Sequence, residues 1–242
     1  MNIGNMGREH LPENRIHQGD CREMLGQVPS ESIDLVIADP PFGIDFRGKP
    51  SNYNRTAGRV VEGYREEGEN YLEFSRAWIS HLPGLLKETG SAFIFSGWNN
   101  LKEVLIAIDE TGLITINHLI WKYQFGVYTR KRFVTSHYHI LFTVKNPVKY
   151  KFHKIDRYPE DVIVIKREYW TGKAKTPTKL PLALVEKLIL YATDPGDLVL
   201  DPFMGSGTTA IAALKTGRRF LGFEVVPEYV RFAEERIRRF TD

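Results

Sequence analysis

Short apolar runs that end at Gly, Pro or Asp alternate along this chain with segments of helical periodicity. This order is typical of an α/β protein, because the chain needs a crossover, usually a helix, between two parallel strands. The run at 33–38 is apolar on both faces, as a central parallel strand requires. No helical segment separates 114–123 from 138–145, so these two strands should pair antiparallel. We expect seven strands, at 15–18, 33–38, 91–96, 114–123, 138–145, 198–200 and 220–223, and helices at 21–27, 71–87, 99–110, 182–193, 208–215 and 227–240.

The length of 242 residues and a hydrophobic share of 42% suit one domain over 1–242 with a sizeable core. Two stretches interrupt the alternation. The polar stretch at 43–70 is too long for a simple connection and is expected to be a functional lid or a mobile loop that faces a nucleic acid. The aromatic and basic stretch at 146–175 is expected to be a small insertion that projects from the sheet and contributes to target recognition.

Cysteine content and hydropathy indicate where the protein works. The single cysteine, Cys21, allows neither an intramolecular disulfide nor a cysteine metal cluster, which points to a reducing compartment. No segment reads as a signal peptide or a membrane span, so we expect a cytoplasmic protein. His137 and His139 should share one face of a strand, but no third ligand accompanies them, and we expect no metal site.

The segment LVLDPFMGSGTT at 198–209 combines a strand, a glycine turn and the start of a helix. Glycines let backbone N–H groups approach a ligand closely, and the N-terminus of a helix favours a carboxylate or phosphate. Glu224 ends the next strand, about 20 residues on, where an acidic side chain can bind ribose hydroxyls in Rossmann-like folds. Together these features predict a nucleoside cofactor, although an ordinary tight turn would also explain the glycines alone.

Asp39, Pro40, Pro41 and Phe42 follow the buried run at 33–38, so the carboxylate should stand at the carboxyl edge of the sheet. The prolines remove two backbone donors and leave carbonyl oxygens as acceptors in a rigid turn. A carboxylate and a nearby carbonyl can accept both protons of an amino group. This arrangement favours a pyramidal nitrogen whose lone pair can act as a nucleophile. Phe42 would stack on the nucleic-acid base that carries the amino group. A plain turn at the end of a strand is the alternative interpretation.

With these residues in view, nearly the whole chain resembles the β class of amino DNA methyltransferases. The resemblance implies a circularly permuted, Rossmann-like fold that binds S-adenosylmethionine, with a mostly parallel seven-stranded sheet in which the last two strands precede the first two. It makes Asp39, Pro40, Pro41 and Phe42 catalytic. Residues 176–181 resemble the family's His-Pro-Thr-Gln-Lys-Pro segment but depart from it at Thr176, Lys179 and Leu180. The implied cofactor-binding residues are Asp20, Cys21, Asp39, Thr176, Thr178, Lys179, Asp201, Phe203, Gly205, Ser206, Gly207, Thr208 and Glu224.

The resemblance also implies contact with double-stranded DNA, from which the target base must be flipped out. The net charge of only +3 does not by itself identify a nucleic acid partner, but the basic residues are clustered. An ordinary solvated surface is the alternative interpretation for each of them. The expected DNA-binding residues are Arg47, Lys49, Arg55, Arg59, Arg130, Lys131, Arg132, His137, Lys149 and Lys151.

Asp39 before the two prolines favours adenine N6 as the methylated amine, and N4 of cytosine is the alternative. Methylation at C5 of cytosine needs a cysteine nucleophile after a proline, whereas Cys21 follows Asp20. An RNA methyltransferase fits the permuted order less well, and a non-catalytic nucleic-acid-binding protein on the same fold is a further alternative. A homodimer, a cognate restriction endonuclease and a prokaryotic cytoplasm complete the expectations.

Overall fold

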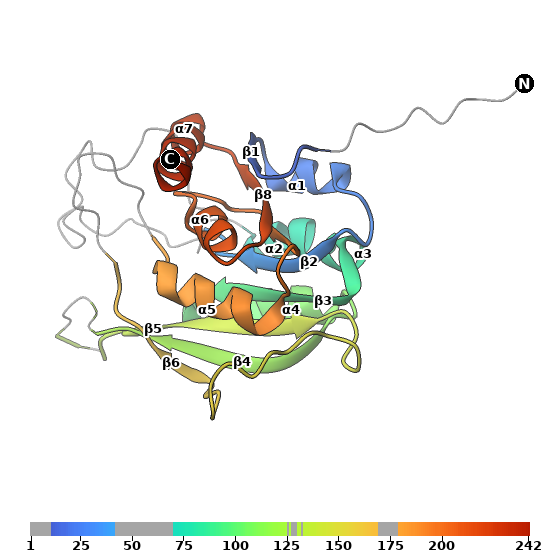
Figure 1. Ribbon diagram of the computed structural model, residues 1–242. Coiled ribbons are helices and arrows are strands. Elements are labelled where there is room, and N and C mark those ends of the chain that lie inside the picture. The colour runs from blue at the N-terminus through green and yellow to red at the C-terminus, as the bar shows by residue number, and fades with distance from the viewer. Residues whose placement is uncertain (1–10, 42–69, 125, 127–129, 132, 169–178) are drawn as a thin grey trace, which may run out of the picture.

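The computed structural model describes residues 11–41, 70–124, 126, 130–131, 133–168 and 179–242. An eight-stranded sheet in the order β1-β8-β7-β2-β3-β5-β4-β6 forms its centre (Figure 1). The strands are β1 (Arg15–Gln18), β2 (Ile33–Ala38), β3 (Leu86–Ser96), β4 (Ile114–Lys122), β5 (His137–Val144), β6 (Val162–Val164), β7 (Leu198–Asp201) and β8 (Arg219–Glu224).

The pairing confirms a mostly parallel sheet with an antiparallel pair. Strands β1, β8, β7, β2 and β3 are mutually parallel, and β4 pairs parallel with β6. Only β5, among the strands in the described ranges, runs the other way, because it pairs antiparallel with both β3 and β4. The carboxyl ends of the five parallel strands therefore lie at one edge, where the loops after β1, β8, β7 and β2 meet.

Helices cover both faces of the sheet (Figure 1). The strand β2 shows the layering, because Leu35 and Ile37 pack into one core cluster while Val36 and Ala38 pack into the other. The first cluster contains residues of α5 (Leu182–Ala192), α6 (Thr208–Lys215) and α7 (Pro227–Thr241). The second contains residues of α1 (Cys21–Met24), the following turn η1 (Leu25–Gln27), α2 (Tyr71–Ile79), α3 (Leu82–Leu85) and α4 (Leu101–Asp109), which follows the short turn η3 (Trp98–Asn100). None of the described helices is both long and apolar enough to cross a bilayer.

Three expectations about the elements were wrong. The sheet has eight strands rather than seven, because β6 adds to the edge beside β4 and only its Ile163 is buried. The helix expected at 71–87 ends at Ile79, since Pro83 has no N–H with which to continue it, and β3 begins at Leu86. The last two strands lie between β1 and β2 rather than ahead of both.

Within the expected insertion, residues 150–153 pack on the rest of the protein. The N–H of His153 donates to the carbonyl of Tyr191 at 2.7 Å, and the ring of Phe152 stacks on that of Tyr191 with 5.2 Å between centroids. Tyr150 meets the buried ring of Phe142 edge to face. These aromatic residues cover one end of α5 and the sheet, whereas residues 157–162 are exposed.

Candidate active site at the carboxyl edge of the sheet

The segments with the expected catalytic and cofactor-binding residues follow four neighbouring parallel strands. Asp20 comes after β1, Glu224 ends β8, the glycine turn follows β7, and Asp39 comes after β2. Neighbouring strands are about 4.8 Å apart, so the glycine turn and Asp39 emerge side by side at the carboxyl edge. The strand order therefore brings together two motifs that are separated by about 160 residues in the sequence.

The glycine turn is held from three directions. The N–H of Phe203 donates to the Asp201 carboxyl at 2.9 Å, and the N–H of Met204 donates to the carbonyl of Phe223 at 2.8 Å. Gly207 has a φ of +79°, and a Cβ added there would lie 2.9 Å from the Cβ of Ala233 on α7. Both the backbone conformation and the close contact with α7 therefore require glycine at this position.

Two buried carboxyl groups stand behind this turn. Burial raises the pKa of Asp201 to about 7, with the negative charge of Glu224 adding to the effect, while hydrogen bonds from Thr209 and the Phe203 N–H act against it. Burial also raises the pKa of Glu224. The Glu224 carboxylate accepts from the N–H of Gly205 at 2.8 Å and of Val226 at 2.9 Å, and so joins the end of β8 to the turn. A carboxylate has about four lone-pair sites, so Glu224 can accept further hydrogen bonds from ribose hydroxyls.

The raised pKa of Asp201 predicts a specific pH dependence of stability. Between the ordinary pKa of 3.8 and about 7, the unfolded chain ionises this carboxyl while the folded protein keeps its proton. The free energy of unfolding contributed by Asp201 is therefore complete below pH 3.8 and decreases as the pH rises towards and through 7. In Asp201→Asn, which stays neutral, urea unfolding should show a smaller loss of stability between pH 5 and pH 8 than in the wild type. Equal losses in the two proteins would contradict the raised pKa.

Asp20 and Cys21 lie at the start of α1, after β1. Asp20 caps the helix by accepting from the N–H of Arg22 at 2.9 Å, and its carboxylate also binds the Arg22 guanidinium. The side-chain hydrogen bond with Arg22 is the main cause that lowers the pKa of Asp20. Burial raises the pKa of Cys21 to about 12, so its thiol is neutral at physiological pH and unsuited to nucleophilic attack.

Asp39 is half-buried at the end of β2, followed by a buried Pro40 and a half-buried Pro41. Phe42 lies outside the described residues. Burial raises the pKa of Tyr138 to about 12, and the negative charge of Asp39 contributes to this rise. Ser96 near the end of β3 pairs with His139 in β5. The start of β5 thus lies at the same edge as Asp39.

The expected DNA-binding residues do not all lie together. Arg130 and Lys131 are exposed between β4 and β5, and His137 is half-buried at the start of β5. Lys149 and Lys151 form ion pairs at the opposite edge of the sheet, apart from the basic residues near β5, and their contact with DNA stays a prediction. Residues outside the described part of the chain are Arg47, Lys49, Arg55, Arg59, Arg132, Thr176 and Thr178.

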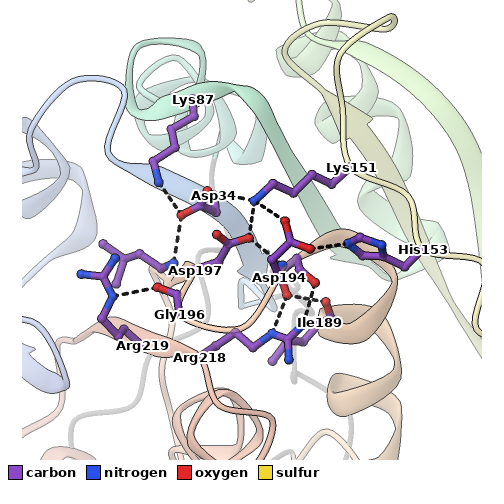
Figure 2. Close-up of polar contacts among 12 residues, drawn as sticks. Asp34, Lys87, Lys151, His153, Ile189, Asp194, Gly196, Asp197, Arg218 and Arg219 are labelled. Carbon is purple, nitrogen blue, oxygen red and sulfur yellow. Dashed lines mark hydrogen bonds and ion pairs between the residues drawn. The ribbon is translucent and has the colours of Figure 1, made fainter.

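Figure 2 shows where Lys151 is engaged. Its Nζ lies 2.5 Å from the Asp197 carboxylate and 3.0 Å from that of Asp194. It also lies 3.6 Å from Asp34, which is only 2% exposed and whose other oxygen accepts from Lys87 at 2.7 Å and from the N–H of Leu198 at 3.0 Å. This ion-pair cluster joins the amino ends of β2 and β7. The positive charge of Lys151 is therefore paired with carboxylates of the protein itself.

The structure adds one contact to the cofactor side that sequence reasoning missed. Arg236 on α7 donates from its guanidinium to the backbone carbonyl of Ser206 in the glycine turn. Lys179 lies near the same end of the sheet and pairs with Glu168 at 2.5 Å. Tyr229 and Ala233 are both buried, so an arginine at position 236 continues the buried face of the helix. A charged residue on such a face is the one feature of the sequence that could have indicated this contact.

Replacing Glu224 by alanine should weaken cofactor binding by about 10- to 100-fold, because hydrogen bonds to the charged carboxylate are lost. The substitution also releases the N–H of Gly205, which the carboxylate holds in the turn. Calorimetric titration with S-adenosylmethionine measures the effect. Glu228→Ala, on the exposed first turn of α7, is the matched control and should bind as the wild type does. An unchanged dissociation constant for Glu224→Ala would refute this assignment.

Comparison with known proteins agrees with this arrangement of loops. Residues 33–235 match the N6/N4 DNA methylase family. The Type II methyltransferase M.HinfI of Haemophilus influenzae is 30% identical over 93% of this chain and 68% of its own length. The Type II methyltransferase M2.DpnII of Streptococcus pneumoniae is 31% identical over 90% of this chain and 87% of its own.

Solved structures give the same result for the fold. The M1.HpyAVI–SAM complex superposes with a TM-score of 0.70 at 28% identity, covering 92% of this chain and 98% of that one. The cytosine-N4-specific PvuII DNA methyltransferase superposes with a TM-score of 0.72 at 22% identity, covering 100% of this chain and 94% of that one. The match over 33–235, together with the shared α/β fold, leads to one conclusion: this chain belongs to the N6/N4 family of DNA methylases.

Proposed function

We propose that this protein transfers a methyl group from S-adenosylmethionine to the N6 amine of an adenine extruded from DNA. One observation carries the proposal: the Asp39-Pro40-Pro41 turn and the glycine turn emerge from the adjacent strands β2 and β7 at one edge of the sheet. A methyl donor beside one turn and a base beside the other would lie within reach of each other.

The residues present fit S-adenosylmethionine. Glu224 offers a buried carboxylate to ribose hydroxyls, and the glycine turn that it holds through the N–H of Gly205 precedes the start of α6. When bound, the cofactor supplies an electrophilic methyl group on a positively charged sulfur. The negative carboxylate of Asp39 at this edge complements that charge. The similar protein M1.HpyAVI has been solved in complex with SAM, which supports this choice of cofactor.

Asp39 would perform the central catalytic task. An exocyclic amine is a weak nucleophile, because its lone pair is delocalised into the ring. The Asp39 carboxylate and a carbonyl of the proline turn can accept the two N–H protons and favour a pyramidal nitrogen. Fixed acceptors of this kind need no reorganisation during the reaction, and they stabilise the positive charge that develops on the nitrogen.

An assay with methyl-labelled S-adenosylmethionine tests the proposal. Genomic DNA from a methylation-deficient bacterium offers many sequences at once, and digestion to nucleosides identifies the labelled base. We expect label on N6-methyladenine. Label on N4-methylcytosine would instead make cytosine N4 the methylated amine. Absence of label from all DNA would favour a non-catalytic binding protein.

Several narrower expectations belong to the proposal. We propose a modification role opposite a restriction endonuclease, which the Type II names of M.HinfI and M2.DpnII support. Mapping of methylated positions across a genome would identify the recognition sequence.

Light scattering of the protein with and without DNA would test the expected homodimer. A cytoplasmic location in a prokaryotic cell stays a prediction.

A further inference from the structure

Arg167 lies in a short segment that follows β6 and is fixed to the end of β4. The N–H of Ile165 donates to the carbonyl of Lys122 at 3.2 Å, and the indole N–H of Trp121 donates to the carbonyl of Ile165 at 2.8 Å. The N–H of Arg167 itself donates to the Gln124 side chain at 2.9 Å. These three hydrogen bonds give the segment a defined position at the carboxyl edge of the sheet.

The Arg167 guanidinium packs on a cluster of aromatic rings. Its Cζ lies 3.9 Å from the ring centre of Tyr123, 5.1 Å from that of Tyr138 and 5.9 Å from that of Trp121. The three rings also contact one another, with centroids 5.4 to 5.6 Å apart. Nε of Arg167 is buried and, within the described part of the chain, has no hydrogen-bond partner. A buried donor without an acceptor is costly, unless a ligand supplies the acceptor.

The next residue fixes the segment from the cofactor side. Glu168 accepts from the N–H of Leu182 at 2.8 Å and pairs with Lys179 at 2.5 Å. Glu168 also acts electrostatically on Arg236, the residue whose guanidinium binds the carbonyl of Ser206. Arg167 therefore lies between the aromatic cluster on one side and a polar chain that leads to the glycine turn on the other.

Strand register places this aromatic cluster across the edge from Asp39. Ala38 pairs with Ile94, and Ile94 with Leu141, so Tyr138 lies two strands from β2 and three residues closer to the carboxyl edge. A base next to Asp39 is flat and has ring acceptors. The half-buried ring of Tyr138 offers part of the surface that such a base needs, whereas Tyr123 is only 3% exposed and packs against Tyr138 within the core. Arg167 packs on both rings.

We propose that Arg167 is a positioning residue that fixes Tyr138, with the buried Tyr123 packed against it, as the wall against which the extruded base rests, opposite Asp39. This inference rests on the proposed function. A chemical role is disfavoured, because a guanidinium would repel the positive charge that develops on the attacked amine. Arg167 should therefore affect capture of the base more than the methyl transfer step itself.

The test compares Arg167→Met with Lys166→Met, a control that removes an exposed positive charge one residue earlier. We expect Arg167→Met to raise the KM for DNA by about tenfold, which corresponds to the free energy of one desolvated cation–π contact. The single-turnover rate at saturating DNA should fall by less than about threefold, and the cofactor dissociation constant should not change. Arg167→Lys, which keeps the charge but loses the flat guanidinium, should recover part of the lost affinity.

A second readout reports on the base itself. With 2-aminopurine in place of the target base, the fluorescence rise on extrusion should be smaller for Arg167→Met than for the wild type or Lys166→Met. A wild-type KM and a wild-type fluorescence rise in Arg167→Met would overturn the inference. Equal weakening by both variants, with a shallower salt dependence in each, would also overturn it and indicate phosphate contacts. A wild-type protein that labels no DNA would instead refute the proposed function.

Discussion

Replacing Asp39 by alanine should lower the rate of methyl transfer by about 10²- to 10³-fold and leave cofactor affinity nearly unchanged. The Asp39 carboxylate follows β2, whereas the residues proposed to hold the cofactor follow β7 and end β8. Loss of a preorganised group that stabilises developing charge lowers a rate by about 10²- to 10³-fold. Single-turnover methylation of DNA measures the rate, and calorimetric titration measures cofactor binding.

Asp39→Asn is the matched control for charge, because an amide keeps one acceptor oxygen and the shape of the side chain. Its rate should lie between those of the wild type and Asp39→Ala. A proportional loss of cofactor binding in Asp39→Ala would show that this residue serves the cofactor rather than the amine. A wild-type rate in Asp39→Ala would show that Asp39 has no catalytic role.

Replacing Asp34 by alanine should lower the free energy of unfolding by about 1 to 3 kcal/mol, because the buried N–H of Leu198 loses its acceptor. Asp34 is only 2% exposed and binds Lys87 and the N–H of Leu198 directly, with Lys151 at 3.6 Å (Figure 2). Lys87 also loses this ion pair, whereas Lys151 keeps Asp194 and Asp197. Urea unfolding followed by circular dichroism measures the change.

Glu235→Ala provides the comparison, because the Glu235–Arg239 pair on α7 is exposed. Exposed pairs contribute at most about 1 kcal/mol, so this variant should unfold close to the wild type. Below the unfolding transition, Asp34→Ala should methylate DNA at the wild-type rate, since its ion pairs lie at the edge of the sheet opposite Asp39. A destabilisation of Asp34→Ala no larger than that of Glu235→Ala would contradict the assignment.

The elements that could be predicted from sequence are those whose signal is local. The strand β2 was predicted with its observed bounds, Ile33–Ala38, because a central parallel strand carries a continuous apolar run. The glycine turn after β7 and the acidic end of β8 could also be predicted. In both places a short apolar strand ends at a characteristic residue, glycine in the first and Glu224 in the second. The same local signals identified the family before any coordinates were known.

What could not be predicted depends on tertiary structure. The strand β6 has three residues and one buried side chain, too few to show an alternating pattern. Lys149 and Lys151 were assigned to DNA on their charge, but the order of basic residues does not reveal which edge of the sheet they reach. Arg167 and Arg236 act through rings and a carbonyl supplied by segments that are distant in the sequence.

Asp39 and the glycine turn should serve one site in which the methyl donor meets the base. A crystal structure of the protein with S-adenosylmethionine and DNA containing the mapped target tests it most directly. We predict ribose hydroxyls at Glu224, the sulfonium methyl directed towards the end of β2, and the target amine within hydrogen-bond distance of the Asp39 carboxylate. A cofactor bound away from Gly205, or a base amine remote from Asp39, would contradict the account.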